Sequence, residues 1–218
     1  MEVLKVNNLK KYYGNNGNIT KALNNISFIV NNNEFVAIMG ASGSGKTTLL
    51  NAISTIDSVT SGSIIINGID ITDLDEEQLS KFRKENLGFV FQDFNLLDTL
   101  TIKENIALSL IINKEDKSKI DNLVLDISKK LGISDIIDKY PYEVSGGQKQ
   151  RCASARALIN NPKLILADEP TGNLDSNSSK QVIHTLSYIN QEFGKTIVMV
   201  THDPQMASYC SRLILLKD

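Results

Sequence analysis

A glycine-rich segment near the N-terminus has the residue types and spacing of a phosphate-binding loop. It reads Gly40-Ala41-Ser42-Gly43-Ser44-Gly45-Lys46-Thr47 and fits the pattern G-x-x-x-x-G-K-[ST]. Its glycines let backbone N–H groups converge on phosphates, and the N-terminus of a following helix adds a favourable dipole. We expect Lys46 to reach the β- and γ-phosphates, Thr47 to offer its hydroxyl to Mg²⁺, and Thr48 to complete the site.

A pair of carboxylates follows a second apolar run, Leu164-Ile165-Leu166-Ala167. A phosphate loop needs an acid for its metal, and we expect Asp168 to hold Mg²⁺ through water. Glu169, the next residue, is placed to polarise an attacking water as general base. Paired acids after a strand are often only the start of a loop, but the phosphate loop upstream favours the catalytic interpretation.

A third motif, Val144-Ser145-Gly146-Gly147-Gln148, precedes Lys149-Gln150-Arg151. A serine and two glycines at the start of a helix leave backbone N–H groups exposed, and such groups can bind an anion. The alternative is a serine-capped helix with a Gly-Gly turn. The motif closely resembles the signature of ATP-binding cassette (ABC) ATPases. The order of the chemical motifs along the chain is similar to the ABC set throughout: phosphate loop, Gln92, signature, Asp168-Glu169, Asn173-Leu174-Asp175 and His202.

The resemblance implies an ATPase that works as a pair of chains. Two cassettes pack head to tail in this family, with each ATP between the phosphate loop of one chain and the signature of the other. A second copy of the chain and a polytopic membrane permease are therefore the expected partners. The residues expected to contact the ATP of the partner chain are Ser145, Gly146, Gly147, Gln148 and Asp175.

The resemblance also assigns roles to single residues. Gln92 should touch Mg²⁺ or the attacking water, and His202 should contact the γ-phosphate and orient Glu169. Tyr13 matches the aromatic residue that stacks on adenine; the neighbouring Tyr12 is the alternative, and we favour Tyr13. The expected catalytic residues are Glu169, His202, Gln92 and Lys46, and the expected metal site consists of Thr47, Gln92 and Asp168.

The remaining histidine and the two cysteines carry no such chemistry. His184 lies in a helical stretch and is interpreted as an ordinary helix residue. Cys152 and Cys210 are far apart in the sequence and have no partner motif for a metal, so both are interpreted as structural.

The elements that must position these residues alternate along the chain. Strands are predicted at 3–6, 26–30, 35–39, 87–91, 164–167, 196–200 and 213–216, with a hairpin-type loop at Gly14–Asn18. Helices are predicted from about Gly45, within the mostly helical stretch 75–136, and at 146–159 and 178–193. This alternation predicts an α/β fold with a parallel sheet and crossover helices. The ABC resemblance adds an antiparallel β subdomain and a helical subdomain at about 93–145, within a single domain spanning 1–218.

Composition excludes several other classes. The 218 residues carry a formal net charge of −2, without the basic surplus that nucleic-acid binding usually needs, so we expect no nucleic-acid partner. No apolar run approaches the roughly 18 residues that cross a bilayer, and the first residues do not resemble a signal peptide. We expect reduced thiols and a location at the cytoplasmic face of the membrane, through a membrane subunit.

Two segments resemble one branch of the family: 89–97, around Gln92, and 168–175. This branch serves lipoprotein release, macrolide efflux and antimicrobial-peptide resistance, and 98–101 and 208–210 most resemble its bacitracin- and lantibiotic-resistance ATPases. A lipoprotein-release or macrolide-efflux ATPase is the alternative; a soluble ABC ATPase of DNA repair or translation, or a regulator without turnover, is a weaker one. The chain ends where such cassettes normally continue, so we expect it to be truncated.

Overall fold

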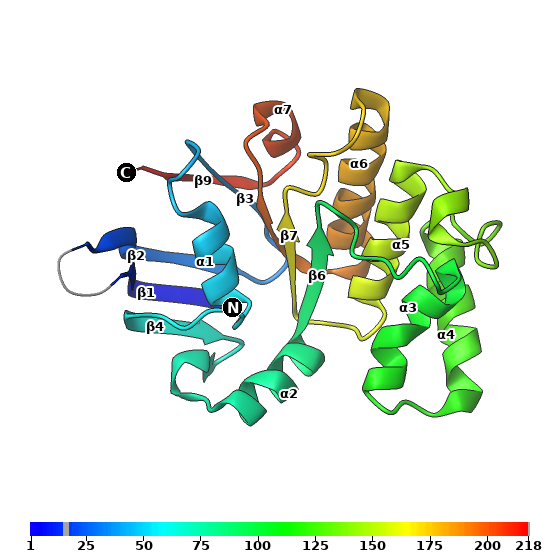
Figure 1. Cartoon of the computed structure of the whole chain (residues 1–218), viewed down its shortest axis with the longest axis horizontal. Coiled ribbons are helices and arrows are strands. Elements are labelled where there is room, and N and C mark those ends of the chain that lie inside the picture. The colour runs from blue at the N-terminus through cyan, green and yellow to red at the C-terminus, as the bar shows by residue number, and fades with distance from the viewer. Residues whose placement is uncertain (15–17, 218) are drawn as a thin grey trace.

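The chain forms two β-sheets that pack around one helix, and a group of helices covers the far face of the second sheet (Figure 1). The structure is a computed structural model that describes residues 1–14 and 18–217. The predicted loop Gly14–Asn18 includes residues 15–17, which lie outside the described residues, as does Asp218.

The first sheet is antiparallel, with the strand order β2-β1-β4-β5. Its strands are β1 (Glu2–Tyr13), β2 (Thr20–Asn31), β4 (Ser61–Ile66) and β5 (Ile69–Asp70). The first two are much longer than the predicted runs, because their pairing continues through polar Asn and Lys residues. The last two were not predicted from the sequence. Together these strands form the expected antiparallel β subdomain.

The second sheet is parallel, with the strand order β6-β7-β8-β3-β9. Its strands are β3 (Phe35–Gly40), β6 (Leu87–Phe91), β7 (Leu164–Asp168), β8 (Thr196–Val200) and β9 (Arg212–Leu216), each close to its predicted position. In β3, Phe35 and Ala37 pack into one hydrophobic core, while Val36 and Ile38 pack into the other. Burial on both faces is why these strands read as continuous apolar runs.

Helices fill the space on both sides of the parallel sheet. Helix α1 (Lys46–Ile53) buries Leu49, Leu50, Ala52 and Ile53 between the two sheets. On the other face lie α5 (Gly146–Leu158) and α6 (Ser176–Phe193), and α3 (Ile102–Ile112) and α4 (Lys117–Lys130) lie farther out, at the right of Figure 1. The remaining helices are α2 (Glu76–Asn86) and α7 (Pro204–Ala207), with short 3-10 turns at Ile71–Asp73 and Pro141–Glu143. Among the described residues, none of these helices is both long enough and apolar enough to span a bilayer.

The topology brings the predicted chemical residues to one edge of the parallel sheet. Strands β3, β6, β7 and β8 run in the same direction, so their carboxyl ends meet there. Gly40 ends β3, Gln92 follows β6, Asp168 and Glu169 stand at the end of β7, and His202 follows β8. Ligands of open parallel sheets bind outside this edge, where the strands end.

Candidate active site

The phosphate-binding loop leaves the central strand β3 and enters helix α1. Gly43 and Gly45 have φ angles of 85° and 88°, a region of backbone conformation that residues other than glycine rarely adopt. A Cβ on Gly45 would lie 2.3 Å from the carbonyl oxygen of Ala22 on β2, so the loop packs directly against the first sheet. Gly45 is also the N-cap of α1 and makes no side-chain cap, which leaves the first N–H groups of the helix available to an anion.

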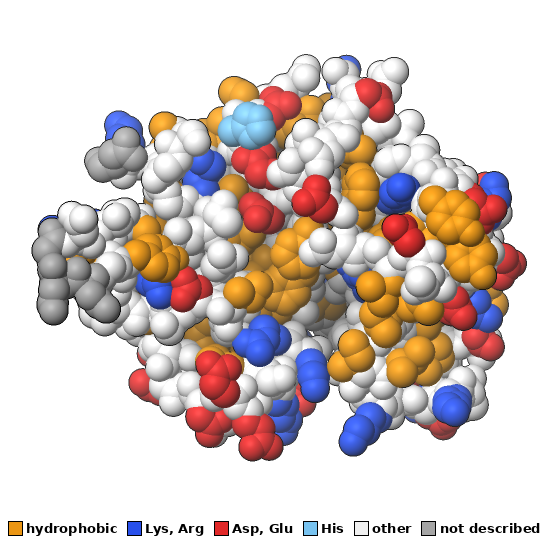
Figure 2. All heavy atoms as spheres, in the orientation of Figure 1, with side chains coloured by type: hydrophobic (Ala, Val, Ile, Leu, Met, Phe, Trp, Pro, Cys, Tyr) orange, Lys and Arg blue, Asp and Glu red, His pale blue; other side chains and the backbone are white. Residues whose placement is uncertain are grey.

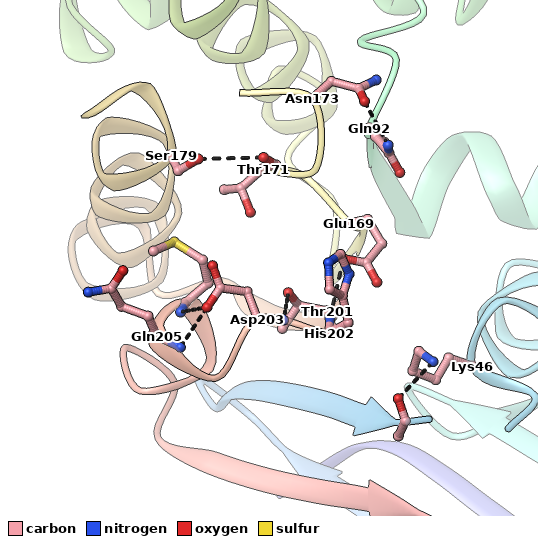
Figure 3. A network of polar contacts seen from close by, with 12 residues as sticks. Lys46, Gln92, Glu169, Thr171, Asn173, Ser179, Thr201, His202, Asp203 and Gln205 are labelled. Carbon is pink, nitrogen blue, oxygen red and sulfur yellow. Dashed lines mark hydrogen bonds and ion pairs between the residues drawn. The ribbon is translucent and has the colours of Figure 1, made fainter. Parts of the chain in front are cut away.

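Lys46 curls back over its own loop (Figure 3). Its ammonium group donates hydrogen bonds to the carbonyl oxygens of Gly40, at 3.0 Å, and Ala41, at 2.8 Å. The positive charge is therefore held at the loop, where a bound triphosphate would offer it stronger acceptors.

A pocket of about 380 Å³ opens above the loop. Its lining comes from three parts of the chain: the phosphate loop with the first turn of α1, strand β2, and the acid that follows β7. The lining residues are Thr20, Lys21, Ala22, Ser42, Gly43, Gly45, Lys46, Thr47, Thr48 and Glu169. The three residues of β2 were not predicted. The signal that could have found them is the hairpin loop, because pairing across it sets Thr20 opposite Tyr13 and Lys21 opposite Tyr12.

Asp168 ends β7 with an unusual buried oxygen. Its Oδ1 atom is buried and has no hydrogen-bond partner among the described residues. Burial raises the pKa of this carboxyl, the adjacent negative charge of Glu169 raises it further, and the positive charge of Lys46 acts in the opposite direction. A buried acceptor without a donor next to a phosphate loop fits the expected metal ligand, because a divalent cation would satisfy that oxygen.

Glu169 stands in a strained backbone conformation at the edge of the pocket. Its φ angle is 43°, in the left-handed region, and its N–H donates to the carbonyl oxygen of Val200 at 3.0 Å. Strain of this kind typically persists at active sites, where surrounding contacts hold it. The bond to β8 directs the glutamate into the pocket, where its side chain is only 18% exposed.

His202 lies beside Glu169 (Figure 3). Its Nδ1 atom is 2.9 Å from Glu169 Oε2, and its backbone N–H donates to the same oxygen at 3.3 Å. The histidine ring is 71% exposed, so its second nitrogen remains accessible to a ligand. The two residues are 33 positions apart in the sequence and meet because β7 and β8 are adjacent in the sheet.

Gln92 follows β6 and reaches toward the segment after Glu169 (Figure 3). Its Nε2 donates to Asn173 Oδ1 at 2.9 Å, and Asn173 Nδ2 donates to Asp93 Oδ1 at 2.6 Å. Gly172 makes room for this approach, since a Cβ there would lie 2.9 Å from the amide carbon of Gln92. The hydrogen bond uses the nitrogen of the amide, while the amide oxygen is the atom that the metal role requires.

The signature motif begins helix α5, outside the pocket. Ser145 is its N-cap and forms a capping box: Gln148 N–H donates to Ser145 Oγ at 3.3 Å, and Ser145 N–H donates to Gln148 Oε1 at 2.9 Å. None of the four signature residues 145–148 lines the pocket above the phosphate loop. Helix α5 instead packs against α3, α6 and β6, so the structure does not bring the signature and the phosphate loop of one chain together.

Two further polar residues connect the signature helix to the edge of the sheet. Gln150 is fully buried, and its Nε2 donates to the carbonyl oxygens of Phe91, at 3.1 Å, and Pro170, at 2.8 Å. It thereby joins α5 to the segments that carry Gln92 and Glu169, a role that was not predicted. Asp175 caps α6 by accepting hydrogen bonds from Ser178, and these bonds lower its pKa.

The two tyrosines at the end of β1 have different surroundings. The hydroxyl of Tyr13 donates to Asp57 Oδ2 at 2.6 Å, and Tyr13 lies near Thr48 of α1. The hydroxyl of Tyr12 donates to Asn24 Oδ1 on β2 at 3.0 Å. The contacts of Tyr13 are with the region around the phosphate loop and its helix, which supports the preference for Tyr13.

Comparisons with known proteins agree with this geometry. The family model described as ABC transporter matches residues 23–172. The bacitracin export ATP-binding protein BceA of Halalkalibacterium halodurans is 53% identical over 218 residues, which cover 100% of this chain and 86% of that protein. The macrolide export ATP-binding/permease protein MacB of Mannheimia succiniciproducens is 44% identical over 218 residues, and this chain spans 34% of its length.

A solved structure has the same fold. It is a dimeric structure of a post-hydrolysis state of the ATP-binding cassette MJ0796, a protein of Methanocaldococcus jannaschii, bound to ADP and Pi. The two chains are 42% identical, and the match covers 98% of this chain and 94% of the solved one. They superimpose with a TM-score of 0.87.

Proposed function

Because this chain belongs to the ABC transporter family and is an ATPase of that family, we propose that it works as a homodimer that binds two ATP molecules between its copies and drives a membrane subunit. One observation carries this proposal. Glu169 lines the pocket above the phosphate loop and is bonded to His202, while the signature lies outside that pocket. Each chain thus has a catalytic half-site and a separate anion site that can serve a partner.

The residues of the pocket have the roles needed to cleave the terminal phosphate. The N–H groups of the loop bind the phosphates, and Lys46 leaves the carbonyls of Gly40 and Ala41 for the β- and γ-phosphates. Glu169 takes a proton from water as the water oxygen attacks the γ-phosphorus. The bond from this phosphorus to the bridging oxygen breaks, and ADP and phosphate leave. His202 holds the carboxylate through Oε2 and turns its exposed nitrogen to the γ-phosphate.

The residues that would hold Mg²⁺ are Thr47, Asp168 and Gln92. The unpaired Oδ1 of Asp168 and the exposed Thr47 side chain in the pocket support this assignment. A bound Mg²⁺ would supply Lewis-acid chemistry there, withdrawing the negative charge that develops on the phosphates during cleavage. Gln92 contributes its amide oxygen while its nitrogen stays bonded to Asn173.

The anion site at the start of α5 contacts the γ-phosphate of the ATP bound to the partner chain. Its donors are the backbone N–H groups of Gly146 and Gly147 and the hydroxyl of Ser145, because the capping box already uses the Gln148 N–H. Asp175, at the start of α6, faces the partner as well. The dimeric cassette structure of MJ0796 supports a pair of this kind.

Exposed apolar side chains on the face beside the site support a membrane partner. Ile56 is 59% exposed and Leu97 is 48% exposed, whereas Leu96 packs against the core. Figure 2 shows hydrophobic side chains gathered on this face, on both sides of a hollow between the sheets and the α3–α4 region. A helix of the membrane subunit that docks against these side chains would hold the chain at the inner face of the membrane.

The cargo we propose is an antimicrobial peptide of the bacitracin type, which the similarity to the bacitracin export ATP-binding protein BceA supports. The similarity to MacB keeps macrolide efflux as the second candidate.

The ATPase assignment is tested with Glu169→Gln, which keeps the size and hydrogen bonding of the side chain but removes the base. ATP should still bind, turnover should fall by about 10²-fold or more, and a dimer closed on unhydrolysed ATP should appear in size-exclusion chromatography. A variant that keeps its activity and does not dimerise would contradict the assignment.

The membrane partner is tested separately. Leu97→Asp should abolish co-purification with the membrane subunit while leaving ATP binding intact, and Leu123→Asp, at an exposed position on α4, is the matched control. Deleting the gene should raise sensitivity to bacitracin; a strain that becomes sensitive only to macrolides would favour the second candidate.

A further inference from the structure

Tyr13 is the last residue of β1, and the residue is 41% exposed. An exposed tyrosine at the end of a strand normally turns freely about its side-chain bonds, and a base that stacks on it must immobilise the ring at an entropic cost. In this chain the ring is already held at two places. One is its hydroxyl, bonded to Asp57, and the other is its face, next to the ammonium group of Lys11.

Asp57 lies in the turn that follows α1, four residues past the end of the helix. Its Oδ2 accepts the Tyr13 hydroxyl at 2.6 Å, and its Oδ1 accepts Lys11 Nζ at 2.7 Å. The hydrogen bond with Asp57 raises the pKa of Tyr13. Burial acts to raise the pKa of Asp57, but the hydrogen bonds from Lys11 and Tyr13 outweigh it and lower the value. Asp57 is thus an ionised acceptor, the stronger kind.

Lys11 is buried and precedes Tyr13 by two positions on the same strand, so both side chains point to the same face of the sheet. Its Nζ donates to Asp57 Oδ1 and, at 2.6 Å, to the carbonyl oxygen of Ser58, and it lies 4.8 Å from the centre of the Tyr13 ring. The ammonium group therefore fixes Asp57 and contacts the tyrosine ring at once.

We propose that Lys11 and Asp57 are positioning residues that clamp Tyr13 in the orientation a nucleobase stacks on, and so increase the affinity for a nucleotide over that for a bare triphosphate. The proposal rests on the proposed function, in which Tyr13 stacks on adenine. Tyr12 is not held in this way. Its hydroxyl bonds to a neutral amide of the paired strand, and Lys21 Nζ lies 5.7 Å from the centre of its ring, farther than Lys11 lies from Tyr13.

The test compares the affinity for Mg-ATP with that for inorganic triphosphate plus Mg²⁺, which lacks a base. Tyr13→Phe and Asp57→Ala should each weaken ATP binding by about 3- to 10-fold, while triphosphate binding stays within about twofold because the phosphate loop is untouched. When Tyr13→Phe and Asp57→Ala are combined, the loss of ATP affinity should be no greater than in the weaker-binding single variant, since both changes release the same ring. Tyr12→Phe is the matched control and should leave both affinities unchanged.

Tyr13→Ala tests base stacking on Tyr13 separately from the clamp. This variant should weaken ATP binding by about 10-fold or more, and if it does not, stacking on Tyr13 is wrong and the clamp fails with it. If Tyr13→Ala weakens binding but Tyr13→Phe and Asp57→Ala do not, stacking stands and the clamp is overturned. An equal loss of ATP and triphosphate affinity would also overturn it, because that result indicates a structural role only. Should Asp57→Ala not fold, Tyr13→Phe and Asp57→Asn decide the matter.

Discussion

Helices α1 and α5 both begin at glycine-containing segments that can bind phosphate, yet they are built differently. At α1 the N-cap is Gly45, in a left-handed conformation without a side-chain cap, and Lys46 and Glu169 lie in the same pocket. At α5 the N-cap is Ser145, closed by a capping box with Gln148, and neither residue belongs to that pocket.

The difference indicates a division of labour. The start of α1 joins backbone donors to a lysine and a glutamate in one pocket, an arrangement that suits binding and cleavage of a triphosphate. The start of α5 has donors but no catalytic acid in its first turn, and its own box already keeps the helix end stable. A helix end that is stable alone and still offers N–H groups to an anion suits a contact made only when a second chain arrives.

The largest effects are expected from substitutions that disrupt the start of α1 and the start of α5 separately. Lys46→Ala should abolish ATP binding by the single chain, because the loop loses its cation. Ser145→Arg should leave that binding intact but block the partner's phosphate. Turnover should fall by about 10²–10³ in both variants. Binding measured by calorimetry separates the two variants, and loss of single-chain binding in Ser145→Arg would contradict the division of labour.

A smaller effect is expected from adding one methyl group at each start. In Gly45→Ala the new Cβ meets a backbone oxygen at 2.3 Å in a left-handed conformation, so the cost should be about 1–3 kcal/mol, or roughly 2–12 °C in Tm. In Gly146→Ala the new Cβ meets only the tip of Leu174, at 2.7 Å, and that flexible side chain can move. Thermal melts should show a large loss for the first variant and little change for the second; similar losses would mean that the two segments have the same backbone demands.

The smallest effects concern two acids with opposite pKa shifts. Asp168 has its pKa raised by burial and by Glu169, so its ionised form opposes folding, and Asp168→Asn should raise Tm without nucleotide while lowering turnover. This gain should shrink as the pH falls, because the wild-type carboxyl then takes up a proton.

Asp175 has its pKa lowered by hydrogen bonds from Ser178. Its contribution to the stability of the fold is therefore present above the unfolded pKa and is lost as the pH falls through the folded pKa. Asp175→Asn should therefore lower Tm slightly at neutral pH, and a rise would contradict this account.

The local parts of the site could be predicted from the sequence. The phosphate loop and the acids after β7 are contiguous motifs beside buried strands, and alternation with helices fixes the parallel sheet. The pairing of Glu169 with His202 was expected only from the family resemblance. What could not be predicted depends on partners distant in sequence. Gln92 finds Asn173 81 positions away, and Tyr13 finds Asp57 44 positions away.

The first sheet illustrates the same limit. Strands β1 and β2 extend through polar residues because their pairing partners continue, and a window of sequence cannot contain that information. For the same reason Lys21 and its neighbours on β2 were not predicted as part of the pocket. Helix caps are the opposite case, since Ser145 and Gln148 are three residues apart and their box is a local signal.

The central claim is that each active site is shared between two chains, and mixing two inactive proteins tests it most directly. Lys46→Ala and Ser145→Arg homodimers should each be nearly inactive. In a mixed dimer one composite site carries both lesions and the other carries neither, so ATPase activity should return, to at most half of the wild-type value per dimer. A site contained in one chain predicts no recovery. The result that would contradict the account outright is a Ser145→Arg homodimer with full ATPase activity, because the signature would then have no part in ATP hydrolysis.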